Sequence, residues 1–385
     1  MPAVWREQIA RELHELERQF LLRHLPEPRL LESTPDFHSN DYLGLSRHPA
    51  VIEAAIGYIS KNGFGSGGSR LISGNRRIHQ QLEECIAAYK CRPSALCYSS
   101  GFATAMGVVP TLMQGPNDLI LIDRFAHACL VDAARASGAR LRVFAHNDVE
   151  QLDHLLKKNS KKFRRILIIA EALYSMDGDF CPLNEFVALK EKYGALLLLD
   201  EAHSTGIQGP EGRGWAASHG LSQHIDIGMG TLGKALGSSG GFVVLEQKLR
   251  EILINRSRQF IFTTAPPGAC CAAAMAAIEI CLSKEGEKLR KDLQKNNILM
   301  RTLLYKPMSE SPILPYHLGN EQLALQVSQQ LAQLGWLLPA IRYPTVKKGT
   351  ARLRITVKSF HTQQQITSLV AAIQEAHKNC NKEIS

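Results

Sequence analysis

The sequence predicts an α/β protein built on a mainly parallel sheet with helices on both faces. Apolar segments with the length of buried strands recur at residues 95–98, 119–122, 141–144, 166–170, 196–200, 225–229 and 242–245. Helical patterns separate several of these segments, at residues 101–113, 149–159 and 183–193. Short apolar strands that alternate with helices are typical of a parallel sheet that is covered on both sides.

An amphipathic helix precedes this region. Its apolar residues recur at helical spacing and are Trp5, Ile9, Leu13, Leu16 and Phe20. The helix is expected to end before Pro26 and to form an arm that needs another surface to lie on. A polar turn at residues 39–45 then leads into a predicted helix from Pro49 to Asn62.

The C-terminal part predicts a smaller α+β domain. Its expected elements are helices at 268–283 and 285–304, a strand beginning at 335–338, an alternating strand at 351–357 and a last helix at 361–378. We therefore expect an N-terminal helical arm (1–39), a large ligand-binding α/β domain (40–278) and a small domain (279–385).

Composition narrows the class of protein. The chain has 385 residues, 45% of them hydrophobic, and a formal net charge of +9, which favours anionic ligands without naming one. The nine cysteines include no C-x-x-C pair, so we expect reduced thiols in a cytoplasmic protein and no metal site. No apolar run is long enough for a membrane span, and the basic cluster at 157–165 is typical of a solvated helix end rather than a nucleic-acid surface.

One lysine, Lys234, stands among glycines and small residues in the segment 226–242, DIGMGTLGKALGSSGGF. A lysine in a small, apolar, turn-rich setting can act as an amine nucleophile, for example in a Schiff base with pyridoxal phosphate. By itself the segment favours a lysine in a surface loop, and only the residues elsewhere in the chain reverse that interpretation.

The other groups that pyridoxal phosphate requires are present in a suitable order. Asp200 ends an apolar strand, where its carboxylate can pair with the ring nitrogen, and His203 can reach the phenolic oxygen. Residues 100–102 open a helix after a strand and offer backbone N–H groups to a phosphate, to which Thr231 can add a hydroxyl. Each residue alone could be a structural cap, but their combined order is not expected by chance.

Two nucleotide-binding patterns are rejected. Gly228-x-x-x-x-Gly233-Lys234 approaches a P-loop, yet Ala235 replaces the hydroxyl that binds magnesium, and the carboxylate strand ending at Asp200 precedes the lysine instead of following it. Residues 63–68 match G-x-G-x-x-G, but a predicted helix precedes them where a dinucleotide fold needs a strand.

The sequence resembles the α-oxoamine synthases, pyridoxal phosphate enzymes of fold type I that condense an amino acid with an acyl thioester. The matching segments are 39–45, 63–74, 99–102, 123–128, 175–179, 200–209, 230–241 and 340–356, which span nearly the whole chain. DEAHSTG at 200–206, GTLGKALGSSGG at 230–241 and AIRYPTVKKGTARLRIT at 340–356 are most similar to the branch that joins L-alanine to a pimeloyl thioester in biotin synthesis. The expected fold is that of fold type I, with an N-terminal arm and a small C-terminal domain.

The resemblance implies a cofactor role for a set of residues, with Lys234, His127 and Asp200 as the catalytic groups. Lys234 binds the aldehyde, Asp200 the ring nitrogen, and His127 stacks on the ring. The full expected set is Ser100, Gly101, Phe102, His127, Ser175, Asp200, His203, Thr231, Lys234, Thr263 and Thr264. Of these, Ser175 and His203 lie near the phenolic oxygen, and Thr263 or Thr264 reaches the phosphate of the neighbouring subunit, because family members are homodimers with shared sites.

The resemblance also implies substrate contacts. Arg354 is expected to hold the amino acid carboxylate, and the other expected contacts are Arg23, Asn40, His127 and Thr345. Arg23 is the candidate for the far carboxylate of the pimeloyl chain. Tyr343 and Lys347 stand where the family tends to have proline. The resemblance therefore does not assign the residues that form the wall around the acyl chain.

The implied mechanism begins when alanine displaces Lys234 and the freed amine removes the Cα proton. Attack on the thioester, loss of carbon dioxide and reprotonation follow. Three alternatives stay open: a family member that uses glycine with an acetyl, succinyl or fatty acyl thioester, one that makes an aminoketone signal, and a non-catalytic partner subunit. The acyl group can arrive on coenzyme A or on an acyl carrier protein.

Overall fold

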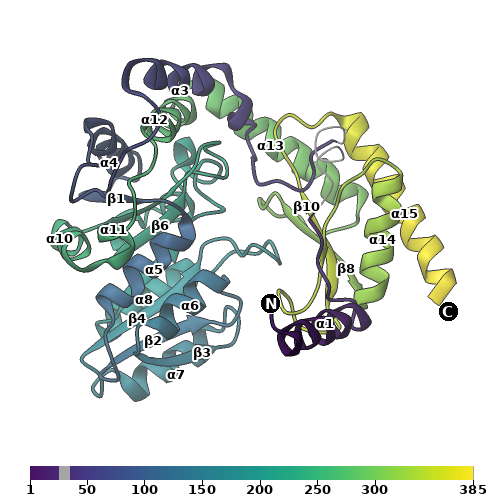
Figure 1. The fold of residues 1–385 in the computed structure, drawn as a ribbon, viewed down its shortest axis with the longest axis horizontal. Helices are drawn as coiled ribbons and strands as arrows, with labels where there is room; N and C mark the ends of the chain where they lie inside the picture. Colours follow the sequence, from purple (N-terminus) through teal and green to yellow (C-terminus); the bar gives the residue numbers. More distant parts are fainter. Residues whose placement is uncertain (26–34, 385) are drawn as a thin grey trace. The chain divides into compact units, whose positions relative to one another are not determined.

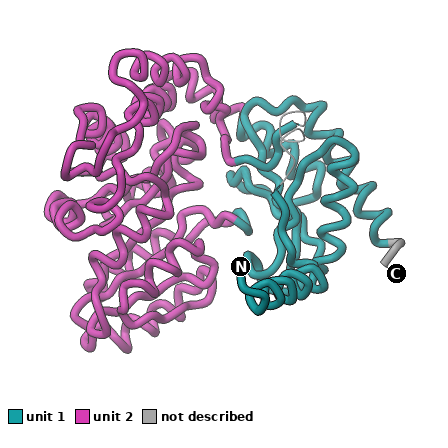
Figure 2. Tube along the Cα trace, in the orientation of Figure 1, with its two compact units in different colours: residues 1–39, 176–178, 293–385 teal, residues 40–175, 179–292 magenta. Residues whose placement is uncertain are grey.

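The computed structural model describes residues 1–25 and 35–384, which form two compact units (Figures 1 and 2). The large unit comprises Asn40–Ser175 and Asp179–Asp292, and the small unit comprises Met1–Ser39, Met176–Gly178 and Leu293–Ser385. Residues 1–39 belong to the same unit as the C-terminal part, and the last change of unit, between Asp292 and Leu293, falls inside a helix. The expected division at residues 39 and 278 stays a prediction.

The large unit is organised around a seven-stranded sheet in the order β1-β7-β6-β5-β4-β2-β3. Its strands are β1 (Ser94–Tyr98), β2 (Asp118–Asp123), β3 (Arg140–Phe144), β4 (Arg165–Glu171), β5 (Leu196–Asp200), β6 (Ile227–Thr231) and β7 (Gly241–Leu245). Neighbours from β3 to β6 pair parallel, whereas β7 pairs antiparallel with both β6 and β1. The mainly parallel sheet that the sequence predicts is therefore confirmed.

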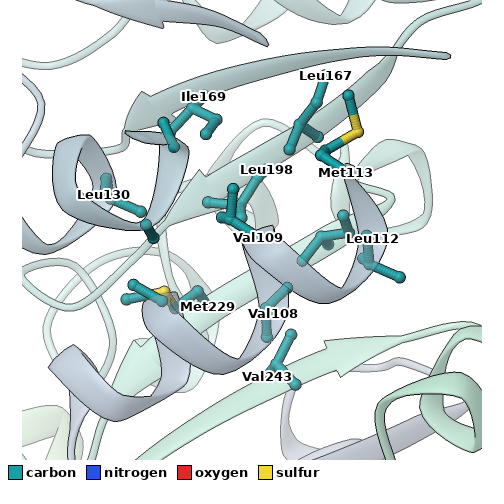
Figure 3. Close-up of a cluster of buried hydrophobic side chains, with 14 of the residues drawn as sticks. Val108, Val109, Leu112, Met113, Leu130, Leu167, Ile169, Leu198, Met229 and Val243 are labelled. Carbon is teal, nitrogen blue, oxygen red and sulfur yellow. The ribbon is translucent and has the colours of Figure 1, made fainter. Parts of the chain in front are cut away.

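Helices cover both faces of this sheet because its strands are apolar on both sides. Ile120 and Leu198 face the cluster formed by α5 (Gly101–Leu112) and α6 (Ala128–Ala136), and Figure 3 shows Val108, Val109 and Leu112 of α5 pointing toward the strands. The adjacent strand residues, such as Leu197, point the other way, toward α7 (Val149–Asn159) and α8 (Leu183–Tyr193). The parallel strand ends thus lie at one edge of a rigid layer, where loops can present side chains to a ligand.

The remaining helices of the large unit surround this layered core. They are η1 (Leu45–Arg47), α3 (Pro49–Asn62), α4 (Arg77–Tyr89), η2 (Pro210–Gly212), α9 (Trp215–Ser218), η3 (Ser222–His224), α10 (Gln247–Arg256), α11 (Arg258–Ile261) and α12 (Gly268–Leu282). Helix α13 (Lys284–Leu303) continues the chain across the change of unit between Asp292 and Leu293.

The small unit contains a three-stranded antiparallel sheet in the order β8-β10-β9. Its elements are α1 (Ala3–Arg18), β8 (Ile313–Gly319), α14 (Glu321–Gln333), β9 (Ala340–Ile341), β10 (Ala351–Thr356) and α15 (Gln363–Ile384). The sequence pattern did not predict β8. This strand contains Pro315, which has no backbone N–H, and it lies at the edge of the sheet, where a proline is tolerated. The pattern also did not predict α14.

One predicted strand is wrong. Residues 335–338 are not extended in a ladder, because Gly335 turns with a φ of 80° after α14 and pairing begins only at Ala340. Leu338 is nevertheless buried, so the apolar pattern there reflects packing and not sheet pairing.

Helix α1 forms where predicted, but it ends at Arg18 and none of its residues is buried. Phe20 follows with a φ of 57°, and Pro26 lies outside the described residues. Trp5 and Leu13 remain exposed, as expected for an arm whose apolar stripe needs a further surface. No helix within residues 1–25 and 35–384 is long and apolar enough to cross a membrane.

Candidate active site

Lys234 is presented by a tight connection between β6 and β7. Leu232 N–H donates to Gly240 O at 2.9 Å, and Gly237 N–H donates to Lys234 O at 2.9 Å. Gly237 has a φ of 59°, and a Cβ at this position would lie 2.3 Å from Ser46 N, so only glycine fits. The glycines and small residues that made the segment look like a surface loop instead let the backbone approach its neighbours closely.

The Lys234 amine contacts a histidine that is itself held by a tyrosine. Lys234 Nζ lies 2.6 Å from His203 Nε2, and the opposite ring nitrogen, Nδ1, lies 2.6 Å from the hydroxyl of Tyr42. His203 and Tyr42 are both buried. The Tyr42 hydroxyl also lies 3.3 Å from Asn40 Oδ1, which brings an expected substrate contact to the same cluster. Sequence reasoning missed Tyr42, although it lies in the turn that the resemblance singled out.

Asp200 is the last residue of β5 and is 5% exposed. Its Oδ1 accepts a hydrogen bond from Ala202 N–H at 2.9 Å. Burial raises the pKa of the Asp200 carboxyl, while the Lys234 charge, the Ala202 N–H and His127 act in the opposite direction. A buried carboxylate close to the Lys234 amine suits the protonated nitrogen of a pyridine ring.

A second buried acid, Glu171, ends the neighbouring strand β4 and pairs in register with Asp200. Sequence reasoning did not name Glu171. The available signal is that ILIIAE and LLLLD are both apolar strands that end in an acid at the same edge of a parallel sheet.

His127 is fixed by its position as the N-cap of α6. The ring Nδ1 of His127 accepts a hydrogen bond from Cys129 N–H at 3.2 Å and lies 3.0 Å from Cys129 Sγ. The backbone N–H of His127 donates to Glu171 Oε1. Although His127 is exposed as a residue, the surrounding protein partly excludes water from its ring and lowers the pKa of His127. The imidazole is therefore neutral at pH 7, and because Nδ1 accepts a hydrogen bond its proton sits on Nε2. Cys129 was missed by the sequence.

The N-terminus of α5 offers an anion site. Ser100 caps the helix by accepting from Ala103 N–H at 3.0 Å, which leaves the N–H groups of Gly101 and Phe102 at the positive end of the helix. A Cβ on Gly101 would lie 3.7 Å from the Thr231 Cβ, so the structure brings these two expected phosphate contacts together.

Three more residues of the expected cofactor set lie in the large unit, namely Ser175, Thr263 and Thr264. Ser175 is buried four residues after Glu171. Thr263 and Thr264 follow α11, and Thr264 forms an isolated bridge with Ser69 in the glycine-rich loop. Thr264 therefore lies beside the glycine-rich loop.

Three expected substrate contacts lie in the small unit. Arg354, on β10, is buried and donates from Nη1 to Thr356 Oγ1 at 2.8 Å. Arg23 Nη2 donates to Thr345 Oγ1 at 3.1 Å, so these two expected contacts are neighbours despite their separation in sequence. Arg342, which the sequence did not single out, donates to the carbonyl groups of Phe20 and Leu22 and so fixes the backbone that carries Arg23.

The chemistry of the large unit fits pyridoxal phosphate. A primary amine, a buried carboxyl and a helix N-terminus are the three groups that the aldehyde, the ring nitrogen and the phosphate require. The described residues include no group of histidine, cysteine and acidic side chains that could hold a metal ion.

Comparisons with known proteins agree with this site. Residues 35–373 match the family model of aminotransferase class I and II. The chain is 42% identical over 334 residues to an 8-amino-7-oxononanoate synthase of Pelobacter propionicus, covering 86% of this chain and 85% of the relative. A serine palmitoyltransferase from S. paucimobilis with bound PLP superposes with a TM-score of 0.89 at 28% identity, over 99% of this chain and 100% of that one. An 8-amino-7-oxononanoate synthase from Francisella tularensis gives a TM-score of 0.78 at 29% identity, over 92% and 100%.

These matches span both units and include structures that contain the cofactor. Pyridoxal phosphate is accordingly the cofactor of this fold-type-I enzyme. The chain belongs to the aminotransferase class I and II family, in its α-oxoamine synthase branch.

Proposed function

We propose that the protein catalyses the decarboxylative condensation of L-alanine with a pimeloyl thioester. The products are 8-amino-7-oxononanoate, carbon dioxide and the free thiol, a step of biotin synthesis. The observation that carries the proposal is the Lys234–His203 contact of 2.6 Å beside the buried Asp200, in a chain 42% identical to an 8-amino-7-oxononanoate synthase.

Bound pyridoxal phosphate supplies an aldehyde that amines join and a ring that accepts electrons from the amino acid Cα. Lys234 Nζ holds the aldehyde at rest and, once released, takes the Cα proton. His203 Nε2 orients this amine, and the Tyr42 hydroxyl holds the opposite ring nitrogen. With the cofactor bound, the negative charge of Asp200 would keep the ring nitrogen protonated, and the neutral His127 would lie against the ring.

The substrates carry carboxylates that need separate cations. Arg354 binds the alanine carboxylate, for which a guanidinium offers paired donors. Arg23, with Thr345 beside it, binds the far carboxylate of the pimeloyl chain. Asn40 contributes a polar contact beside Tyr42.

A homodimer with shared sites is part of the proposal. Helix α3 and the loop after it expose large apolar side chains, namely Ile52, Ile56, Ile59, Phe64, Leu71 and Ile72. Exposed apolar residues in this number are typical of a protein interface. We propose that Thr263 or Thr264 contacts the phosphate in the partner's site, that the enzyme is cytoplasmic, and that coenzyme A or an acyl carrier protein delivers the acyl group.

A second candidate is a serine- or glycine-using synthase with a different acyl donor. It is favoured by the TM-score of 0.89 to a serine palmitoyltransferase. The two candidates share the cofactor site and differ in the substrates, so a substrate comparison separates them.

The test is a rate assay of alanine, glycine and serine against acetyl-, succinyl-, palmitoyl- and pimeloyl-thioesters. We expect alanine with the pimeloyl donor to give the highest kcat/KM. Lys234→Ala is the control that abolishes turnover while leaving the fold intact. A preference for glycine, for serine, or for a donor without a terminal carboxylate would contradict the proposed substrates but not the cofactor site.

A further inference from the structure

Two buried carboxyl groups lie side by side at the edge of the sheet where Lys234 is presented. Glu171 and Asp200 are the last residues of adjacent parallel strands, pair in register, and are 3% and 5% exposed. Residues in register on parallel strands point to the same face of the sheet. Two carboxylates this close and this buried cannot both keep a negative charge without a large cost.

The surroundings of the two acids decide which one carries a proton. Asp200 accepts the Ala202 N–H, and the positive charge of Lys234 is its largest stabilising influence. Glu171 accepts only the backbone N–H of His127 among its described hydrogen bonds, and no lysine or arginine in the described part of the chain forms an ion pair with it. Burial and the Asp200 charge raise the pKa of Glu171 to about 8, although the Lys234 charge and the His127 N–H act on it in the opposite direction.

Glu201, the next residue after Asp200, shows what a buried charged glutamate looks like in this fold. It is also 3% exposed, but its Oε2 lies 2.6 Å from Lys90 Nζ and its Oε1 accepts from Ala216 N–H at 3.0 Å. Glu171 has no comparable cation. The two glutamates therefore form a matched pair for substitution.

We propose that Glu171 is a positioning residue that works in its protonated, neutral form. As a neutral carboxyl it leaves Asp200 as the single negative charge beside the cofactor's ring nitrogen, and it holds the backbone N–H of His127. The proposal rests on the cofactor site described above and adds to it a residue that does not contact the substrate. Charged or titratable groups that face Glu171 from its neighbouring elements are Asp123, His127, Cys129, Tyr174, Asp200 and Lys234.

The consequence is that the stability of the fold depends on pH even when no cofactor is bound. A carboxyl whose pKa is higher in the folded than in the unfolded state makes the fold bind the proton more tightly. The stability that Glu171 contributes is full below the unfolded pKa of about 4.5 and is lost as the pH rises through about 8. Above that pH the second negative charge repels Asp200.

The decisive variant is Glu171→Gln, which keeps the shape and the neutral state, with Glu201→Gln as its control. In cofactor-free protein we expect the melting temperature of Glu171→Gln to fall less than that of wild type between pH 6 and pH 9. In the loaded enzyme we expect kcat within about threefold of wild type and a weaker alkaline decline of activity. Glu201→Gln removes the carboxylate that pairs with the buried Lys90, which keeps only Thr205 Oγ1 and the Arg213 carbonyl, so the melting temperature of this variant should fall at every pH.

Two results would overturn the proposal. One is a loss of activity in Glu171→Gln as large as that in Asp200→Asn, because Glu171 would then be needed as an anion. The other is a pH–stability profile in Glu171→Gln that coincides with wild type. Failure of the alanine and pimeloyl assay would instead contradict the proposed substrates, since the cofactor-free melting profile does not depend on them.

Discussion

His203 connects the Lys234 amine to the Tyr42 hydroxyl through its two ring nitrogens, each at 2.6 Å. The three side chains come from the loop after β6, the turn after β5 and the polar turn before η1. A histidine held at both nitrogens has a fixed orientation, so Lys234 Nζ meets its neighbour in one geometry. This arrangement makes Tyr42 a testable part of the site.

Tyr42→Phe should slow proton transfer without abolishing cofactor binding. The change removes the hydroxyl that holds His203 Nδ1 but keeps the buried ring. We expect the exchange of the alanine α-proton with solvent to fall about tenfold, less than the 10²–10⁴-fold effect of a group that transfers the proton itself, because Tyr42 acts only through His203. NMR of alanine in deuterated water measures this rate, and the absorbance of the bound cofactor is the control. An unchanged exchange rate would mean that Tyr42 only packs.

Asp200→Asn should affect chemistry more than folding. The amide keeps the size of the side chain but removes the charge that holds the ring nitrogen protonated. We expect the rate of α-proton exchange to fall about a thousandfold, equivalent to about 4 kcal/mol. The same NMR measurement applies, and a melting temperature close to that of wild type shows that the fold survives. If the variant exchanges at the wild-type rate, the role given to Asp200 is wrong.

The sheet and the lysine site could be predicted because their signals are local. The strands of the large unit are short and largely apolar. Asp200 and Thr231 end two of them, and Lys234 follows Thr231 by three residues. In a parallel sheet these positions share one edge, so sequence order alone predicts that they gather. The contact between Gly101 and Thr231 follows from the same rule.

The groups that hold the site were missed because their signals depend on tertiary contacts. Tyr42 becomes relevant only when folding brings its hydroxyl to the imidazole Nδ1 of His203, 161 positions away in the sequence. Cys129 is only two residues from His127, but its role there depends on the local helix start at α6. Glu171 resembles an ordinary strand end until the strand register sets it beside Asp200. In the small unit β8 was not predicted because Pro315 is unfavourable in a strand, and the edge position of β8 makes it tolerable there.

Lys358→Met should destabilise the fold through the loss of its ion pair with Asp36. Lys358 is fully buried, pairs with Asp36 and donates to Ser39 Oγ at 2.7 Å. Burial raises the pKa of Asp36, but the hydrogen bonds from Lys358 and Ser39 outweigh it and hold that pKa well below its usual range. Removing the cation should cost about 3 kcal/mol, the lower end for buried pairs because the Asp36 side chain is 33% exposed.

Urea unfolding at several pH values measures this cost. The stability from a depressed carboxyl pKa is present above the unfolded value of 3.8 and is lost as the pH falls below it, so the difference from wild type should shrink in acid. Lys348→Met, at an exposed lysine of the same unit, is the control and should change stability by less than about 0.5 kcal/mol. A constant difference down to pH 3 would exclude the ion pair as the cause.

Arg23→Ala should weaken the binding of the acyl donor and spare alanine. Arg23 is exposed and donates to Thr345, and Arg342 fixes its backbone through Phe20 and Leu22. Because a hydrogen bond to a charged group contributes about 1.5–3 kcal/mol, loss of the guanidinium should raise the KM for a pimeloyl thioester about tenfold or more. The KM for alanine and the rate of its α-proton exchange should stay at the wild-type values.

A donor without a terminal carboxylate supplies the sharpest comparison for Arg23. Octanoyl thioester has no anion for the guanidinium to bind, so Arg23→Ala should change its KM little while raising that of the pimeloyl donor. Arg11→Ala, at an exposed arginine on α1 that pairs only with Glu7 in the described contacts, should leave both donors unchanged. The measurement is the steady-state KM of wild type and of both variants for each of the two donors. An equal rise in KM for both donors in Arg23→Ala would show that the arginine shapes the entry segment instead of reading the far carboxylate.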